Sequence, residues 1–595
     1  GRKSATRRGA RRRSRSTQQR ARSSDHDDGG KRSLRAQSWQ TQVETPVTAV
    51  DGDRWMAAGT GLAAQPEVCV REARSLVEGR LGRRSFLLKS AAGAAVIPLI
   101  GCGETTGRVV DLGHPLIVGS GFGGGVSALR FTEAGIPVTV LERGRRWPIT
   151  DARDTFCSLR EPDERSAWLA TESPIGLVRR GLPRYTGIIE RFLGDNIDAM
   201  IGAAVGGGSL AYAGMLLRVP RALWSGVFPA DISYDDMEST WYPRVSTLLP
   251  GRTVPTDILE SPTYEAARIF IDHAMNAGLE IEMIEQAIDW DLVRAELDGS
   301  MPAEAIAGDY VYGLNSGAKG SIDRTYIAAA EATGLCDLKP LHQVASVAST
   351  TGGGFRVECE RIAEDGTVLE RITFLAPVLV MSAGSIHSTR LLVEARGRGA
   401  MSALPTEIGE GWGQNGQHIF VRGSLMENTG ALQGGPPFVV IRDLDNAVAP
   451  VTIEYGAAAW GFESHSLICP GASIPDGFGG FRYDAAEDRA VLEWDPANKV
   501  TARMAAESVG ATLNAANGGE ITSLPGRSRE STFHPLGGCV VGRACDTFGR
   551  VRGVPGLYVV DGALVPGVTP TCNPAWTITA LAERALDTIL REDFA

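Results

Sequence analysis

Short apolar segments alternate with a helical pattern from about residue 114, and this alternation predicts the first elements of the fold. Residues 114–118 (His-Pro-Leu-Ile-Val) and 138–141 (Val-Thr-Val-Leu) have the length and composition of buried strands. Between them, Val126, Leu129 and Ala134 are spaced so that they would face the core from one helix. A strand, a helix and a second strand in this order indicate an α/β fold with a parallel sheet.

The C-terminal part of the chain shows a second strand and a longer helix. Residues 557–560 (Leu-Tyr-Val-Val) predict a short buried strand that ends at Asp561-Gly562. Pro574 is acceptable in the first turn of a helix. After it, apolar positions recur at spacings of three and four residues, at Ile578, Leu581, Ala582, Ala585, Leu586 and Ile589. We therefore expect an amphipathic helix whose N-terminus lies beside Asn573.

A glycine-rich turn follows the first predicted strand. Gly119, Gly121 and Gly124 form a Gly-x-Gly-x-x-Gly motif with the expected strand before it and helix after it. Gly119 permits the tight turn, Gly121 allows the backbone to approach a pyrophosphate, and Gly124 lets the helix pack on the strand. Glu142 ends the second strand, 18 residues after Gly124, where a carboxylate commonly binds the adenosine ribose. The motif predicts a dinucleotide site and does not distinguish FAD from NAD.

Charge is distributed unevenly along the 595 residues. The chain has 60 Lys and Arg against 70 Asp and Glu, but residues 1–36 hold 13 basic and only 3 acidic side chains. We expect residues 1–80 to be a disordered, basic, low-complexity region. The rest of the chain is strongly acidic, which argues against a nucleic-acid partner.

Residues 81–102 are similar to a bacterial export sequence. Arg83-Arg84 precede a short apolar run that ends in Leu99-Ile100-Gly101-Cys102. This run is shorter than the roughly 20 residues that span a bilayer and suits the core of a signal peptide. The arginine pair resembles a twin-arginine signal, and the final four residues resemble a lipobox whose Cys102 would be acylated. We expect an exported, secreted or cell-surface lipoprotein that associates with the membrane through Cys102; the alternative is a buried amphipathic helix.

The cysteine pattern does not indicate a metal site. The nine cysteines include no Cys-x-x-Cys pair and are too sparse for a disulfide scaffold. We expect no metal ion.

Several further segments carry a resemblance to a known family. They are residues 205–210 (Val-Gly-Gly-Gly-Ser-Leu), 534–539 (His-Pro-Leu-Gly-Gly-Cys) and 573–584 (Asn-Pro-Ala-Trp-Thr-Ile-Thr-Ala-Leu-Ala-Glu-Arg), with shorter ones at 341–344, 382–385 and 411–416. Together they resemble the glucose-methanol-choline (GMC) family of FAD-dependent alcohol oxidoreductases, over the chain from about residue 114 to its end. Within that family the sequence is most similar to the bacterial cholesterol oxidases that bind FAD non-covalently. The resemblance therefore implies that the dinucleotide is FAD.

The resemblance also implies the domain organisation. Residues 113–149, 318–410 and 549–595 would form a doubly wound, Rossmann-like FAD-binding domain built from discontinuous segments. Residues 150–317 and 411–548 would form an α+β substrate domain with a β-sheet. Besides the glycine motif, Glu142 and Asp561, the residues carried over as FAD contacts are Phe122, Gly123, Gly208, Tyr212, Met215, Val344 and Gly562.

Some positions depart from the family pattern. Tyr212-Ala213 stands where the cholesterol oxidases have Asn-Gly, Ala575 replaces a Phe, and one residue is added between Asp561 and Asn573. Because these positions would adjoin the flavin, its contacts are expected to differ there.

Three residues are the expected catalytic groups. His534 can exchange a proton with the alcohol or hydrogen-bond its oxygen, since an imidazole titrates near neutral pH. Asn573 would orient the hydroxyl and contact the flavin. By position, Glu454 matches the carboxylate with which cholesterol oxidases move a proton from C4 to C6 of the steroid, and burial beside a steroid would raise its pKa.

The expected activity is oxidation of a 3β-hydroxysteroid to the ketone with O₂ as acceptor, giving H₂O₂, followed by Δ5 to Δ4 isomerisation. The expected partners are the sterol or another bulky alcohol and O₂, and we expect a monomer. One alternative is a flavin dehydrogenase that oxidises another bulky alcohol and passes electrons to a quinone or cytochrome. The other is a non-catalytic lipoprotein that binds a steroid.

Overall fold

The computed structural model describes residues 107–595 except 177–178 and 525–528. The predicted basic region (1–80) and the predicted export sequence with Cys102 (81–102) lie outside the described residues.

A five-stranded parallel sheet forms the centre of the nucleotide-binding part. Its strand order is β21 (Leu557–Val559), β11 (Leu379–Met381), β2 (Leu116–Val118), β3 (Val138–Leu141) and β7 (Cys336–Lys339). All four pairings are parallel. The strands predicted at 114–118, 138–141 and 557–560 are confirmed within one or two residues, because each is a short run of apolar residues buried on both faces.

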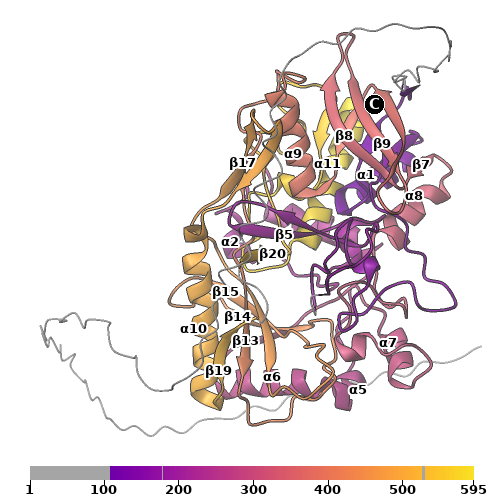
Figure 1. Cartoon of the computed structure of the whole chain (residues 1–595). Coiled ribbons are helices and arrows are strands. Elements are labelled where there is room, and N and C mark those ends of the chain that lie inside the picture. The colour runs from indigo at the N-terminus through magenta and orange to yellow at the C-terminus, as the bar shows by residue number, and fades with distance from the viewer. Residues whose placement is uncertain (1–106, 177–178, 525–528) are drawn as a thin grey trace, which may run out of the picture. The chain divides into compact units, whose positions relative to one another are not determined.

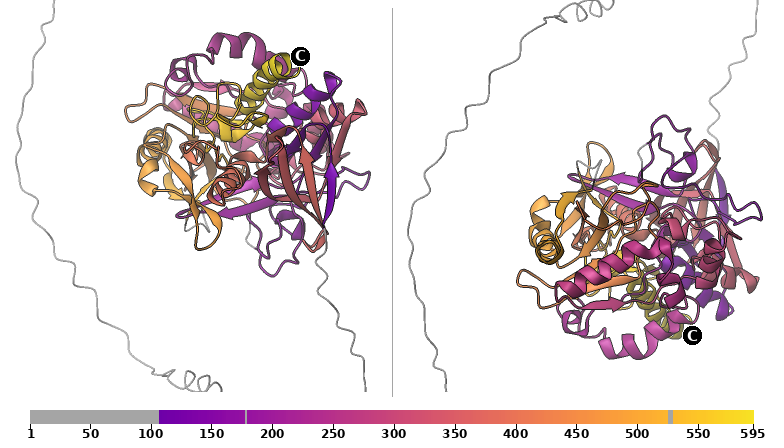
Figure 2. Two further views of the ribbon diagram at one scale, coloured as in Figure 1. Left: turned by 90° about the horizontal axis from the view of Figure 1, so that it is seen from above. Right: turned by 90° about the horizontal axis from the view of Figure 1, so that it is seen from below.

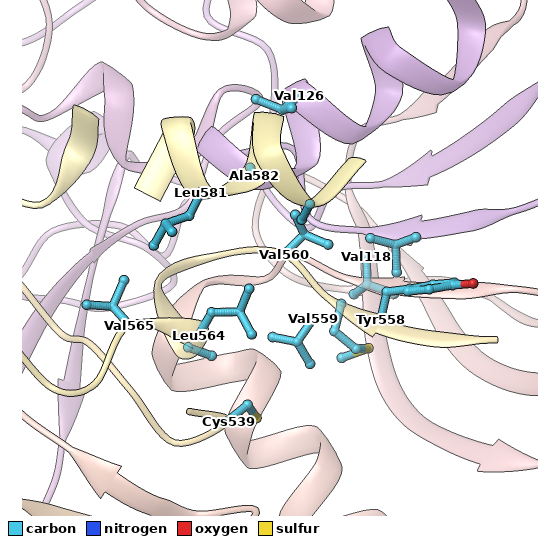
Figure 3. Close-up of a cluster of buried hydrophobic side chains, with 14 of the residues drawn as sticks. Val118, Val126, Cys539, Tyr558, Val559, Val560, Leu564, Val565, Leu581 and Ala582 are labelled. Atoms are coloured by element: carbon cyan, nitrogen blue, oxygen red, sulfur yellow. The ribbon is translucent and has the colours of Figure 1, made fainter. Parts of the chain in front are cut away.

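Helices α1 (Phe122–Glu133) and α11 (Ala575–Asp593) pack against each other on this sheet. Figure 3 shows side chains of the core they share, including Val126 of α1 and Leu581 and Ala582 of α11. Val126 and Leu129 are buried as predicted. Ala134 is exposed, contrary to the prediction, because α1 ends at Glu133 and Ala134 is its C-cap.

Helix α11 is more deeply buried than its sequence pattern predicts. The apolar stripe from Leu581 to Ile589 faces the core as expected. Its polar positions Thr577, Thr579 and Glu583 are also fully buried. The reason is that α1 and α4 (Tyr242–Ser246) cover the remaining sides of the helix and supply partners for Thr577 and Glu583, while the Thr579 hydroxyl donates to the Ala575 carbonyl of α11 itself.

Two further sheets are mainly antiparallel. An antiparallel sheet of β8 (His342–Ser349), β9 (Phe355–Ile362) and β10 (Val368–Ala376) adds β1 (Arg108–Asp111) in parallel at its edge. A six-stranded antiparallel sheet has the order β19 (Glu520–Ser523), β13 (Gln417–Gly423), β16 (Leu467–Ala472), β15 (Val451–Glu454), β14 (Val439–Asp443) and β6 (Ile281–Met283).

Helices α10 (Val500–Asn517) and α6 (Glu265–Asn276) pack on the six-stranded sheet. In Figure 1 this sheet and α10 occupy the lower half of the view, and α1, α9 (Gly384–Gly397) and α11 the upper half. Both views in Figure 2 show α10, in orange, beside strands of the same colour. Between the two halves, β20 (Glu530–Thr532), β5 (Ile197–Gly202) and β4 (Ile189–Leu193) form a small sheet.

The fold-class prediction is confirmed. The parallel sheet takes β2 and β3, β7 and β11, and β21 from three regions that are far apart in the sequence. Among the described residues, no helix combines the length and the apolar character needed to cross a membrane.

Candidate active site

A cavity of about 810 Å³ lies where the parallel sheet meets the six-stranded sheet. It opens at the carboxyl ends of β2 and β3, the position at which ligands commonly bind to open parallel sheets. Fourteen of the fifteen predicted site residues line it: Gly119, Gly121, Phe122, Gly123, Glu142, Gly208, Tyr212, Met215, Val344, Glu454, His534, Asp561, Gly562 and Asn573. The structure therefore brings together residues from the glycine motif, from residues 205–210 and 341–344, and from the C-terminal segments 534–539 and 573–584.

The fifteenth residue, Gly124, lies against the backbone instead of the cavity. A Cβ placed on Gly124 would come within 2.1 Å of the carbonyl oxygen of Gly119. Gly124 thus allows α1 to approach the strand, which is the packing role that the motif predicted for it.

Two glycine turns pack against each other at the cavity wall and fit a pyrophosphate. A Cβ on Gly207 would lie 2.7 Å from the Cα of Gly121, so the two turns meet at a distance that only glycine permits. Gly208 faces open space. Helix α1 begins directly after Gly121, and its unpaired amides and positive dipole end would face the phosphates.

Glu142 is held at the end of β3 by the glycine turn itself. One carboxylate oxygen accepts hydrogen bonds from the amide (3.0 Å) and the hydroxyl (2.7 Å) of Ser120, and the other accepts from the amide of Gly144 (2.8 Å). Burial raises the pKa of Glu142. The side chain still lines the cavity, so the predicted contact with a ribose is compatible with this geometry.

Asp561 connects the last strand of the parallel sheet to α9. Its carboxylate accepts hydrogen bonds from the amide of Gly384 (2.8 Å), the hydroxyl of Ser388 (2.6 Å) and the amide of Ala563 (2.7 Å). Burial raises the pKa of Asp561 to about 6. Gly123 packs directly on this turn, because a Cβ there would lie 1.4 Å from the carbonyl oxygen of Val560.

Tyr212 and Phe122 form an aromatic contact on the cavity wall. Their ring centroids lie 5.6 Å apart in an edge-to-face arrangement. The Tyr212 hydroxyl donates a hydrogen bond to the carbonyl of Gly320 at 2.6 Å and so points away from the cavity. Tyr212 can therefore offer a cofactor only its ring.

His534 and Asn573 meet in the cavity. His534 follows β20, and Asn573 stands immediately before Pro574, the N-cap of α11. The Asn573 Nδ2 atom lies 3.5 Å from the His534 Nε2 atom. Burial lowers the pKa of His534 to about 4, so the ring is neutral at neutral pH. The Oδ1 atom of Asn573 is buried and has no hydrogen-bond partner among the described residues, which suits a group that receives a ligand.

Glu454, the last residue of β15, lies beside Asn573. It is 5% exposed, and burial raises the pKa of its carboxyl to about 8, while a hydrogen bond from Asn573 partly offsets this rise. Glu454, Asn573 and His534 thus form a row of polar groups. Much of the neighbouring wall is apolar, with Val311, Ile419, Trp460, Ile468 and Phe533.

Comparison with known proteins agrees with this geometry. A family model described as GMC oxidoreductase matches residues 483–582, which include His534 and Asn573. A cholesterol oxidase of Mycobacterium tuberculosis is 27% identical over 556 residues, covering 79% of this chain and 90% of that protein. Residues 483–582 thus match the GMC oxidoreductase family, and the chain is similar to a cholesterol oxidase over most of its length. A cholesterol oxidase of Acinetobacter baumannii is 25% identical over 545 residues, covering 80% of this chain and 94% of that protein. The structure of a fungal aryl-alcohol oxidase shares its fold with a TM-score of 0.57 at 14% identity, covering 81% of the chain and 99% of the other protein.

One polar side chain at the site was not predicted from the sequence. Asn415 is fully buried, and its Nδ2 atom lies 3.3 Å from His534 Nδ1. The Asn-Gly pair at 415–416 does indicate a turn, and the φ of Asn415 is indeed 65°. No sequence pattern indicated that this turn lies behind His534, because the two residues are 119 positions apart.

Proposed function

We propose that the protein is an FAD-dependent oxidase of a 3β-hydroxysteroid that uses O₂, releases H₂O₂ and isomerises the Δ5 ketone to the Δ4 ketone. The observation that carries this proposal is the row of Glu454, Asn573 and His534 in one cavity with a largely apolar wall. Oxidation of an alcohol alone needs no carboxyl beside the hydroxyl, whereas isomerisation of the ketone needs a carboxylate that moves a proton from C4 to C6. The name cholesterol oxidase carried by two relatives also supports a sterol substrate.

The residues that would hold FAD are those of the two glycine turns, Glu142, and the turn at Asp561-Gly562. The chemistry that FAD would supply when bound is acceptance of the hydride from the carbinol carbon and transfer of its two electrons to O₂, which with the hydride's proton and the hydroxyl proton gives H₂O₂. The amides at the start of α1 would bind the diphosphate, and the start of α11 would direct its positive dipole end toward Asn573 and the flavin.

The chain's own side chains would position the alcohol and manage its protons. The hydroxyl would lie between His534 Nε2 and the amide of Asn573, where His534 either exchanges its proton or hydrogen-bonds its oxygen. The apolar wall would hold the steroid rings and exclude water. The ionised carboxylate of Glu454 would take a proton from C4 and return it to C6.

The decisive experiment measures peroxide release by the purified flavoprotein with cholesterol, other sterols and simple alcohols. We expect rapid release with sterols and little with small alcohols. A reduced flavin that persists in air while a ketone forms would instead show a dehydrogenase. A colourless protein that binds steroid without turnover would show a binding protein.

A further inference from the structure

The environment of Asn415 determines which of its side-chain atoms faces His534. Its Oδ1 accepts hydrogen bonds from the amide (2.7 Å) and the hydroxyl (3.1 Å) of Thr569. Its Nδ2 donates to the carbonyl of Cys572 at 2.8 Å. Reversing the amide would set two donors against each other at the Thr569 amide and two oxygens against each other at Cys572. The observed orientation is therefore the stable one.

This orientation has a consequence for the imidazole of His534. The second proton of Asn415 Nδ2 points to His534 Nδ1 at 3.3 Å. Nδ1 must then accept, and a neutral imidazole that accepts at one nitrogen carries its proton on the other. The proton of neutral His534 is thus on Nε2, the atom that faces Asn573 and the cavity.

We propose that Asn415 is a positioning residue that holds neutral His534 as the Nε2–H tautomer, so that His534 meets the alcohol as a hydrogen-bond donor to its oxygen. This inference rests on the proposed function for the identity of the reaction. Asn573 Nδ2 is itself a donor, so the 3.5 Å contact gives the Nε2 proton no acceptor there, and the substrate oxygen supplies one. Asn415 also binds the carbonyl of Cys572, the residue before Asn573, and so links the positions of both side chains.

The left-handed backbone at Asn415 makes the arrangement specific for this residue type. Its φ of 65° is a conformation that Asn and Asp tolerate better than other non-glycine residues. Aspartate therefore fits the backbone but replaces the Nδ2 donor with an oxygen. In N415D, His534 Nδ1 would face a carboxylate and gain a proton.

The test records ring-nitrogen NMR spectra of flavin-loaded protein with ¹⁵N-labelled histidine, in which His534→Gln identifies the His534 signals among the eight histidines. In the wild-type protein we expect Nε2 protonated and Nδ1 bare. In N415D we expect a proton on Nδ1 and a titration midpoint raised by about one pH unit or more, because a neighbouring carboxylate favours imidazolium. With a substrate alcohol, kcat should fall about tenfold or more while KM changes little.

Asn196 provides the matched control. It has a φ of 62°, and its Nδ2 donates to the carbonyl of Trp494 at 3.2 Å, but it does not line the cavity. N196D should leave the His534 spectrum and kcat unchanged. A wild-type protein with the proton on Nδ1, or an N415D protein with the wild-type tautomer and midpoint, would overturn the inference. The NMR result is independent of the substrate, so it distinguishes failure of this inference from failure of the sterol-oxidase proposal.

Discussion

Burial shifts the pKa values of His534 and Glu454 in opposite directions. The pKa of His534 falls to about 4 and that of Glu454 rises to about 8, because removal from water disfavours the charged form of each. At neutral pH both side chains are mainly uncharged. The two predicted steps, alcohol oxidation and isomerisation, should therefore respond differently to pH and to substitution.

Substitution of His534 should remove oxidation without removing the flavin. His534→Gln keeps polarity and approximate size but lacks the imidazole, so kcat with a sterol should fall by about 10²–10⁴. Peroxide release measures this, and flavin absorbance shows that the cofactor stays bound. His465→Gln, at an exposed histidine, is the control and should retain activity. Loss of flavin in His534→Gln would mean that His534 serves mainly to bind the cofactor.

Isomerisation should become faster as pH rises toward 8, because Glu454 must be ionised to take the C4 proton. Below its pKa of about 8 the ionised fraction falls about tenfold per pH unit. The rate of 4-en-3-one formation from added 5-en-3-one should follow this fraction. A pH-independent rate would contradict the assignment.

Glu454→Gln should release the 5-en-3-one while oxidation continues. Glu282→Gln, on β6 of the same sheet, is the control because its carboxylate is half exposed and pairs with Arg442.

Glu454→Gln should also raise the Tm more at pH 8 than at pH 5. In the folded wild type, Glu454 has a raised pKa, so its unfavourable contribution to stability grows as pH rises from about 4.5 to 8.

At the scale of elements, α11 is fixed to the nucleotide-binding part by a buried carboxylate. Glu583 has no exposed side-chain surface and pairs with Arg130 of α1 at 2.6 Å and with Arg244 of α4 at 3.0 Å. It also accepts a hydrogen bond from the hydroxyl of Tyr326 at 2.8 Å. Because α11 begins beside Asn573, these contacts help to hold the middle residue of the row formed by Glu454, Asn573 and His534.

Removal of the Glu583 carboxylate should be strongly destabilising. Glu583→Ala removes the buried partner of Arg130, which keeps only the half-exposed Glu133, and should lower the free energy of unfolding by about 3–5 kcal/mol. Denaturant or thermal unfolding of the holoprotein measures it. Glu592→Ala is the control on the same helix, since Glu592 pairs with Arg550 at an exposed position and should contribute less than about 1 kcal/mol. Equal losses in the two variants would show that burial of the Glu583 pair has no special effect.

At the scale of the whole molecule, the basic N-terminal region and the acidic remainder fit an exported enzyme. We propose that Arg83-Arg84 direct twin-arginine export and that Cys102 is acylated, which would keep the enzyme near sterol in a membrane. Sterol dissolves in lipid, so an anchored enzyme would meet its substrate at high local concentration.

Export and anchoring can be tested separately. Replacing Arg83 and Arg84 with lysine should retain the protein in the cytoplasm, and Cys102→Ser should move it from the membrane fraction to the soluble fraction. Cell fractionation of a bacterial host measures both. Cys69 precedes both the arginine pair and Cys102, so Cys69→Ser should have no effect. Membrane association that survives Cys102→Ser would contradict lipidation.

The sequence by itself determined the local elements and the kind of site. β2, α1, β3, β21 and α11 follow from runs of apolar residues and from the glycine motif, because burial and turn geometry act on neighbouring residues. The resemblance to the GMC family identified His534, Asn573 and Glu454 as candidate catalytic residues. The structure brings all three into one cavity.

Only the tertiary structure decided which distant side chains meet and what protonation they favour. Asn415 lies behind His534 across 119 residues, and Arg130 meets Glu583 across 453. No periodicity records such contacts, because they depend on how whole sheets and helices pack. Desolvation is also a property of the packed molecule. The resemblance to the cholesterol oxidases predicted that the pKa of Glu454 would be raised. Only the packing around its carboxyl decides that burial raises this pKa to about 8.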